Sequence, residues 1–356
     1  MKRILKAVLV ILLVLILVVG GYVAYLLIDY HRLPDTDETL ELVGETARTG
    51  EVYEIVTWNL GFGAYSSDFG FFMDGGTESR ARSKDAVYDN LNHASEVLEA
   101  ENPDFMLLQE LDVDATRTYH VDERALMTDR FSDWQGCFAM NYDSGYLFYP
   151  LMKPHGASKA GILTLSRRAI HRFARVSLPV ETGLTRFLDL DRCYSKAYLP
   201  VENGKTLCLY NLHLSAYTSD GTIATEQLRL LLADMREEYA AGNYVVGGGD
   251  FNKDLLGNSD EIFGVSGEAY TWAQPLPEDV FPEGLKLVNS LDANAPVPSC
   301  RNADGPYQPG VSFVLTVDGF ITSDNVKVEA CGVMDEGFAV SDHNPVKMTF
   351  ELMDMN

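Results

Sequence analysis

From residue 51 onward, short apolar runs alternate with amphipathic stretches. The apolar runs predict β-strands at 52–60, 105–109, 160–166, 206–213, 244–248, 314–321 and 346–352. Apolar side chains three or four positions apart predict helices at 83–101 and 225–239. Strands outnumber long helices, which favours an α/β (α+β) sandwich of two packed β-sheets flanked by helices.

The N-terminal pattern is different. Residues 7–28 carry no charge and, as a helix, are long enough to cross a hydrocarbon core of about 30 Å. Basic residues precede this run and Asp29 follows it, so residues 1–30 are expected to form a single-pass transmembrane helix with a cytoplasmic N-terminus. A cleaved signal peptide is the alternative, but its apolar stretch is usually shorter and ends at a small-residue site. We therefore expect a signal anchor in the cell membrane, with the remaining chain extracytoplasmic.

The rest of the chain divides into a short polar segment and one large unit. Residues 31–50 are acid-rich and predict a tether, and residues 51–356 show no repeat or linker that would divide a single catalytic domain. Two stretches, 61–76 and 275–310, have the composition of long loops and are expected to rim a site. Phe69, Phe71 and Phe72 in the first are expected to pack within the loop rather than touch an interface.

Composition narrows the function. The 356 residues are 46% hydrophobic and 22% charged, as in globular proteins, and the net charge is −24. Without residues 1–30 the balance is 25 basic and 51 acidic residues, or −26. This charge argues against unaided binding to nucleic-acid backbones, but a recruited divalent cation would still allow phosphate chemistry. Five widely spaced cysteines indicate neither a disulfide framework nor a zinc cluster.

Polar side chains lie at the ends of the predicted strands, where a packed sheet does not need them. One alone is ordinary turn chemistry, but together they are expected to converge on one rim. Carboxylates at this rim suit Mg²⁺ or Mn²⁺ better than zinc. The set is Asn59, Gln109, Glu110, His213, Asp250, Asn252, Asp318, Asp342 and His343.

Two spacings suggest specific roles. Asp250 and Asn252 are two positions apart, which on a strand places both on one face. His343 can accept a proton from water if a carboxylate such as Asp318 holds its other ring nitrogen. These groups are those required for metal-assisted phosphate hydrolysis.

The ordered motifs resemble the endonuclease/exonuclease/phosphatase superfamily, which includes deoxyribonuclease-like nucleases and neutral sphingomyelinases. The resemblance spans residues 55–349. Its motifs are Thr57-Trp58-Asn59-Leu60, Pro103-Asp104 through Gln109-Glu110, Asn211-Leu212-His213-Leu214, Gly249-Asp250-Phe251-Asn252, Asp318-Gly319 and Ser341-Asp342-His343-Asn344-Pro345.

This resemblance implies a four-layered α/β sandwich with its site at one end of the two sheets. It implies that Glu110 is the main ligand of one or two Mg²⁺ or Mn²⁺ ions, with Asn59 and Asp342 beside the metal. Asp250 and Asn252 would position the nucleophile and the phosphate, and His213 would support a phosphoryl oxygen. The general base is either His343, oriented by Asp318, or Asp250.

The substrate is less defined than the reaction. Family members place an Arg or Tyr against the phosphate, and the candidates here are Arg186, Arg192, Lys196 and Tyr146. The leading hypothesis is a phosphatase or phosphodiesterase acting on a small molecule or lipid headgroup. The alternatives are a membrane-anchored nuclease acting on DNA or RNA and a catalytically inactive binding module. No protein partner is indicated.

Overall fold

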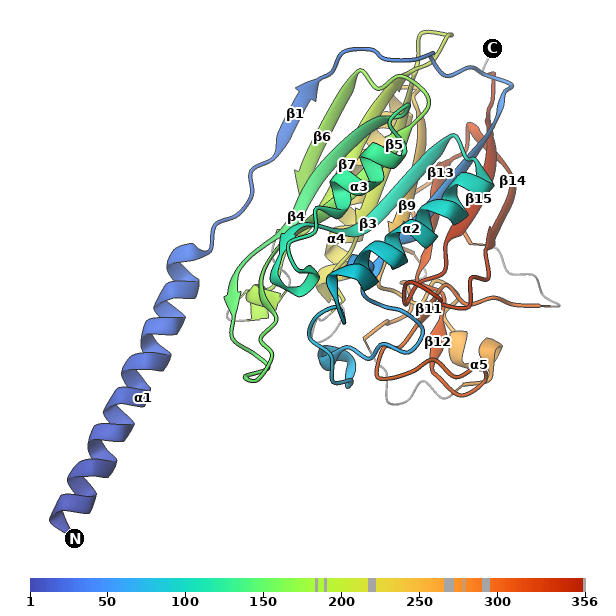
Figure 1. The fold of residues 1–356 in the computed structure, drawn as a ribbon. Coiled ribbons are helices and arrows are strands. Elements are labelled where there is room, and N and C mark those ends of the chain that lie inside the picture. The colour runs from blue at the N-terminus through green and yellow to red at the C-terminus, as the bar shows by residue number, and fades with distance from the viewer. Residues whose placement is uncertain are drawn as a thin grey trace.

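Two large β-sheets pack face to face (Figure 1) in the computed structural model, which describes residues 1–182, 185–188, 191–216, 222–265, 272–277, 279–289 and 295–354. In spatial order, the seven-stranded sheet contains β1 (Thr36–Thr39), β6 (Arg172–Ser177), β7 (Cys193–Pro200), β8 (Thr206–His213), β9 (Tyr244–Asp250), β13 (Asp318–Ser323) and β10 (Leu285–Val288). The six-stranded sheet contains β14 (Val326–Val333), β15 (Val346–Leu352), β2 (Val52–Asn59), β3 (Phe105–Ala115), β5 (Gly156–Ser166) and β4 (Gln135–Leu147). A two-stranded ribbon pairs β11 (Cys300–Arg301) with β12 (Val314–Leu315).

Helices cover the outer face of each large sheet. In the described part of the chain the α-helices are α1 (Lys2–Asp29), which projects from the domain, α2 (Lys84–Glu101), α3 (Glu123–Arg130), α4 (Thr222–Ala240) and the short α5 (Ser259–Phe263) near the two-stranded ribbon. Apolar residues of α2 and α3 pack with the six-stranded sheet, and those of α4 pack with the seven-stranded sheet. The four-layered sandwich predicted from the sequence is therefore confirmed.

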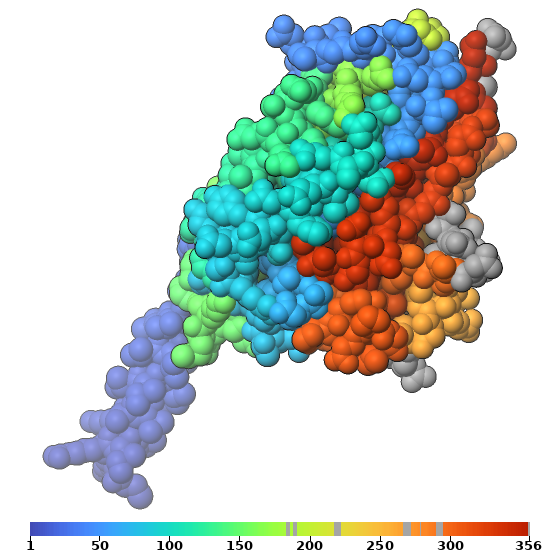
Figure 2. Space-filling model, turned by 45° about the vertical axis from the view of Figure 1, so that its right-hand side comes forward, coloured from blue at the N-terminus to red at the C-terminus, as the bar shows by residue number. Residues whose placement is uncertain are grey.

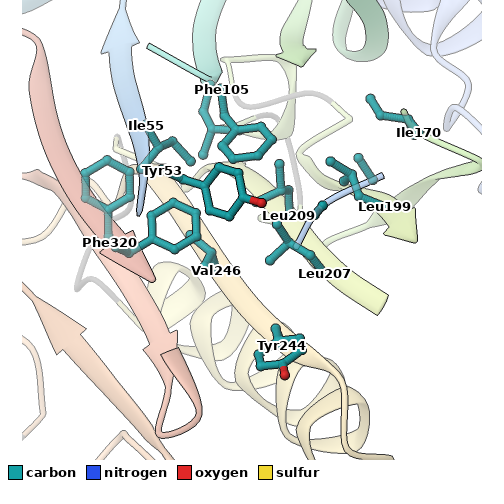
Figure 3. Close-up of a cluster of buried hydrophobic side chains, with 14 of the residues drawn as sticks. Tyr53, Ile55, Phe105, Ile170, Leu199, Leu207, Leu209, Tyr244, Val246 and Phe320 are labelled. Atoms are coloured by element: carbon teal, nitrogen blue, oxygen red, sulfur yellow. The ribbon is translucent and has the colours of Figure 1, made fainter. Parts of the chain in front are cut away.

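The strands in the middle are apolar on both faces because each sheet is covered twice. In β2, Ile55 faces the other sheet, whereas Val56 faces α2, and both are fully buried. Figure 3 shows the cluster between the sheets, where Tyr53 and Phe105 approach Leu209 and Phe320 from the opposite sheet. This rigid centre fixes the positions of the strand ends.

The predicted helices begin and end close to the expected residues. Ser83 caps α2, since its Oγ accepts a hydrogen bond from the backbone N–H of Ala86 at 3.0 Å, and Asn102 ends the helix in the left-handed conformation. The single strand predicted at 314–321 is wrong. The carbonyls of Thr316 and Val317 accept hydrogen bonds from loop residues 255 and 251, so the chain leaves one sheet and enters another between β12 and β13.

Helix α1 projects from the domain with its side chains exposed (Figure 1), and it is long and apolar enough to cross a membrane. The segment 31–50, predicted as a tether, is attached to the domain for part of its length. β1 pairs antiparallel with β6, and Ala47 is fully buried in the core between the sheets. Any free tether is therefore shorter than the sequence indicates, and the domain lies close to the end of α1.

We expect Gly249→Ala to lower the free energy of unfolding, because the backbone around this position leaves no room for a side chain. Gly249 has φ +149°, and a Cβ atom would lie 1.9 Å from the carbonyl oxygen of Leu212 on β8. The expected loss is about 3 kcal/mol or more of unfolding free energy, or roughly 6 °C or more in Tm by calorimetry. Gly332→Ala on β14 is the control, since its Cβ would meet nothing within 4 Å. Equal Tm values for the two variants would contradict this interpretation.

Candidate active site

The polar strand ends meet at one edge of the sandwich. β8 and β9 run parallel, and their registered last residues are His213 and Asp250. β13 runs antiparallel to β9, so its first residue, Asp318, lies opposite Asp250. A cleft of about 510 Å³ opens here and is lined by residues that include Glu110, His213, Asp250, Asn252, Asp342 and His343. These residues converge on one rim, as the sequence predicts. Gln109 does not, because it is fully buried and its side-chain nitrogen donates to Asn211 Oδ1 at 2.8 Å.

A β-bulge in β3 turns Glu110 into the cleft. The register with β5 shifts between Leu108 and Leu111, and Glu110 adopts a positive φ of 56°. The amide nitrogen of Asn59 donates to Glu110 Oε1 and to Asp250 Oδ2, both at 3.1 Å. The asparagine therefore joins the two carboxylates and fixes their separation.

A second group joins three strands. His343 Nδ1 lies 2.8 Å from Asp318 Oδ2, and its Nε2 lies 3.7 Å from Asp250 Oδ2. The Sγ of Cys300 lies 3.6 Å from the same Nε2. Asp318 is held from behind, because its backbone N–H donates to Ser299 Oγ at 3.1 Å. This arrangement orients the imidazole with one nitrogen toward a buried carboxylate and the other toward the cleft.

Burial dominates the ionisation of the site. It raises the pKa of Asp250 to about 7 and the pKa of Asp342 to about 6, although His343 acts to lower both. Burial lowers the pKa of His213 well below its usual value, so this imidazole is neutral at pH 7. Burial also acts to lower the pKa of His343, but the charges of Asp318 and Asp250 outweigh it and raise this pKa well above the usual value.

Asn252 reaches the cleft by a different route from the one predicted. β9 ends at Asp250, and Asn252 lies in a turn with a positive φ of 48° instead of continuing the strand. Its backbone N–H donates to Asp250 Oδ1 at 2.8 Å, and its side-chain nitrogen donates to the carbonyl of Leu214 at 2.8 Å. Because the amide nitrogen is held by the backbone, the amide oxygen has a fixed orientation.

The carboxylate-rich side of the cleft suits a hard divalent cation. The charge of Glu110 contributes to the raised pKa of Asp342, so these two carboxylates are electrostatic neighbours. Their oxygens are the ligand type that Mg²⁺ and Mn²⁺ prefer. Asn59 Oδ1 already accepts the backbone N–H of Gly61 at 3.0 Å, so the asparagine mainly supports Glu110. A cation here would compensate the buried negative charge, and the donor set fits the predicted metal.

Comparison with protein families agrees with this geometry. Residues 56–343 match the Endonuclease/Exonuclease/phosphatase family. The chain belongs to this family. The matched range begins within β2 and ends at His343, so it leaves out β1 and β15. The comparison with curated proteins gives no significant match.

Solved structures share the family fold at low sequence identity. An endonuclease/exonuclease/phosphatase from Beutenbergia cavernae DSM 12333 is 19% identical with a TM-score of 0.58, covering 85% of this chain and 72% of its own. ANGEL2, a 2′,3′-cyclic phosphatase, is 17% identical with a TM-score of 0.55, covering 90% and 99%. TDP2 from D. rerio, solved with a single-strand DNA product, is 15% identical with a TM-score of 0.52, covering 85% and 99%.

Of the four residues that the sequence suggested for phosphate binding, one lines the cleft. Arg192, the residue before β7, lines the cleft beside Glu110 and His213. Lys196 does not, because its ammonium lies 2.7 Å from Asp234 and 2.6 Å from Glu238 on the helix-covered face.

The remaining two candidates lie toward the N-terminal helix. The backbone of Tyr146 contacts α1, since its carbonyl accepts a hydrogen bond from Tyr22 Oη at 3.1 Å. The guanidinium of Arg186 lies 4.6 Å from the ring centroid of Tyr30. The structure therefore brings neither residue into the cleft beside Glu110.

The structure also shows residues that sequence reasoning missed. Arg301 is fully buried and donates to the carbonyls of Ser66, Phe69, Asn302 and Gly305, at 3.1 to 3.2 Å. It joins the two stretches predicted as loops, 61–76 and 275–310, although residues 278 and 290–294 of the second lie outside the described part of the chain.

A side pocket with a mixed charged and aromatic lining adjoins the cleft. It shares Glu110, Arg192 and His213 with the cleft and is also lined by Arg117, which forms a bidentate pair with Asp112 at 2.8 and 3.0 Å. The guanidinium carbon of Arg117 lies 3.8 Å from the ring centroid of a buried phenylalanine, residue 62. Of the three aromatics expected to pack within the loop, Phe69 and Phe71 are buried and Phe72 is half-buried.

Proposed function

We propose that the protein is a divalent-metal-dependent hydrolase of phosphoester bonds, a phosphatase or phosphodiesterase, held on the outer face of a cell membrane by α1. The observation that carries this proposal is the continuous set of contacts at the cleft. It runs from Glu110 through Asn59 to Asp250, and from Asp250 through His343 to Asp318. The Glu110 end of this set is suited to binding a cation, and the His343–Asp318 end is suited to proton transfer.

Glu110 and Asp342 would hold the cation, with Asn59 keeping Glu110 in place. When bound, Mg²⁺ or Mn²⁺ supplies neutralisation of charge on the phosphoryl oxygens. The neutral imidazole of His213, whose Nε2 lies 3.5 Å from Asp250 Oδ2, is placed to donate to a further phosphoryl oxygen.

Hydrolysis needs a base next to the attacking water. The oxygen of the water forms a bond to phosphorus while the bond from phosphorus to the leaving oxygen breaks, and the water proton passes to the base. The two candidates are Asp250 Oδ2 and His343 Nε2, which lie 3.7 Å from each other in the cleft. His343 accepts a proton only in its neutral form, and its raised pKa moves that form to higher pH. Asp318 positions His343 in either case, and Asn252 positions Asp250 through its backbone N–H.

Charge favours a small substrate over a polynucleotide. The net charge of −24 repels a phosphate backbone, because binding to nucleic acid depends on basic side chains that displace counterions. Arg192 in the cleft and Arg117 in the side pocket are placed to contact an anionic group beyond the scissile phosphate.

The test uses the full chain in detergent micelles, supplied with Mg²⁺, Mn²⁺ or chelator. The substrates are a chromogenic phosphodiester, a phosphomonoester, phospholipid vesicles and plasmid DNA. Metal-dependent turnover of the small esters or lipid headgroups supports the proposal. Cleavage of DNA alone would replace it with a membrane-anchored nuclease, and metal binding without turnover of any substrate would replace it with a binding module.

We expect weak salt dependence. For the best substrate, kcat/KM is expected to change less than about threefold between 50 and 200 mM NaCl, because the substrate offers few phosphates. An enzyme that contacts six to ten backbone phosphates loses roughly 10³-fold or more over this range. Initial rates at fixed Mg²⁺ measure the effect, with KCl replacing NaCl as the control for a specific ion effect.

A further inference from the structure

The loop between β4 and β5 exposes a cluster of large apolar side chains. Phe148 is 53% exposed, Tyr149 68%, Leu151 81% and Met152 97%. Residues 144–152 carry no charged side chain, and Lys153 is the first charged residue after them. Contiguous exposed apolar side chains of this kind mark an interaction surface in a protein that is otherwise strongly charged. We name residues 147–153 the β4–β5 tip.

This tip is fixed against α1. Tyr146 N–H donates to Tyr25 Oη at 3.0 Å, and Tyr22 Oη donates to the carbonyl of Tyr146 at 3.1 Å. The rings of Tyr22 and Phe148 meet edge to face with centroids 5.3 Å apart. Both views show this part of the domain beside the outer end of α1 (Figures 1 and 2).

The contacts place the tip at a defined depth along the helix. Tyr22 precedes Asp29, the first charged residue after the apolar run, by seven positions, which is about 10 Å along a helix axis. Phe148, which contacts Tyr22, therefore lies at the level of the apolar run and not at the level of Asp29. Tyrosines at this depth are typical of the membrane–water interface.

We propose that the β4–β5 tip enters the outer leaflet of the bilayer beside α1 and forms a second membrane contact. The occupant of this surface is lipid, because the tip is continuous with the apolar face of the membrane helix and carries no charge until Lys153. The Lys153 ammonium can reach the headgroups while its stem stays in the apolar layer. This inference rests on the proposed anchoring by α1.

The second contact fixes how the catalytic domain faces the membrane. A mainly apolar surface pocket lies between the tip and Phe72 and Met73, and Tyr22 of α1 also lines it. This surface pocket shares Met73, Tyr142 and His155 with the side pocket that reaches Glu110 and His213. With the tip in the leaflet, the side pocket is held next to the bilayer surface.

The test measures the depth of three single cysteines in the full-length chain reconstituted in lipid nanodiscs. Met152→Cys reports the tip, Ile16→Cys reports the interior of α1, and Lys205→Cys on the β7–β8 turn, at the opposite end of the domain (Figure 1), is the control outside the membrane. Each carries an environment-sensitive fluorophore, and the unsubstituted chain gives the labelling background from the native cysteines. Lipids with a spin label near the carboxyl end or near the middle of the acyl chain act as quenchers.

We expect emission at position 152 to shift to shorter wavelength and to be quenched most by the label near the carboxyl end. Position 16 should be quenched most by the deeper label, and position 205 by neither. Position 152 behaving like position 205, while position 16 is quenched, overturns the second contact and leaves the anchor intact. Absence of quenching at position 16 overturns the anchor and this inference with it. Neither result depends on turnover, so failure of the proposed chemistry is detected separately.

Discussion

Glu110→Gln is expected to reduce metal-dependent turnover by about 10³-fold, because it removes the charge that draws the cation into the cleft. The side chain is 27% exposed and faces the cleft from a bulge, with Oε1 held 3.1 Å from the amide of Asn59. Glutamine keeps the shape, so the domain should remain folded while the affinity for Mg²⁺ or Mn²⁺ falls. Initial rates over a metal titration measure the loss.

The control for this variant is Glu329→Gln on β14, an exposed glutamate outside the cleft that pairs with Lys327. It should keep turnover close to that of the unsubstituted chain. A calorimetric readout separates binding from chemistry, because added Mg²⁺ should raise the Tm of the Glu329 variant and not that of the Glu110 variant. Full turnover in a folded Glu110→Gln protein would remove Glu110 from the metal site.

The central strands were predictable from sequence because both of their faces are buried. In β2, for example, Ile55 packs on one face and Val56 on the other, so the sequence shows a nearly unbroken run of apolar residues. The first polar residue after such a run marks the end of the strand clearly. β14 was missed because it is an edge strand with exposed positions such as Glu329, and its pattern is only partly apolar. Part of the site was predictable for the same reason, since Asn59, His213 and Asp250 are the last residues of such strands. Glu110 is an exception, because β3 continues past it to Ala115.

The details of the site depend on backbone features that leave little trace in a single sequence. On a regular strand the side chain of Glu110 would lie on the face of the sheet opposite to that of Gln109. The β-bulge and the positive φ at Glu110 turn it toward the cleft instead. Asn252 enters through a left-handed turn that the spacing from Asp250 alone did not indicate. Arg301 was missed because its role lies in contacts with four backbone carbonyls, and side-chain chemistry alone does not show such contacts.

His343→Gln is expected to lower turnover by roughly 10²- to 10⁴-fold, the range for loss of a proton-transferring side chain. Asp318→Asn is expected to have a smaller effect of the same kind, because it removes the carboxylate 2.8 Å from His343 Nδ1 and leaves the ring in place. If Asp318 acts through the histidine, the double variant should be no slower than His343→Gln alone. Initial rates of the wild type, both single variants and the double variant complete this cycle.

The pH dependence of kcat distinguishes a positioning role of Asp318 from a general structural defect. The charge of Asp318 raises the pKa of His343, so Asp318→Asn should move the histidine limb of the kcat profile to lower pH, whereas a merely structural defect would lower the profile at every pH. His171→Gln, which replaces a histidine that contacts Tyr198 near the far edge of the seven-stranded sheet, is the matched control and should leave rate and profile unchanged. Multiplicative losses in the double variant, with an unshifted profile, would mean that Asp318 acts independently of His343, and the orienting role would have to be abandoned.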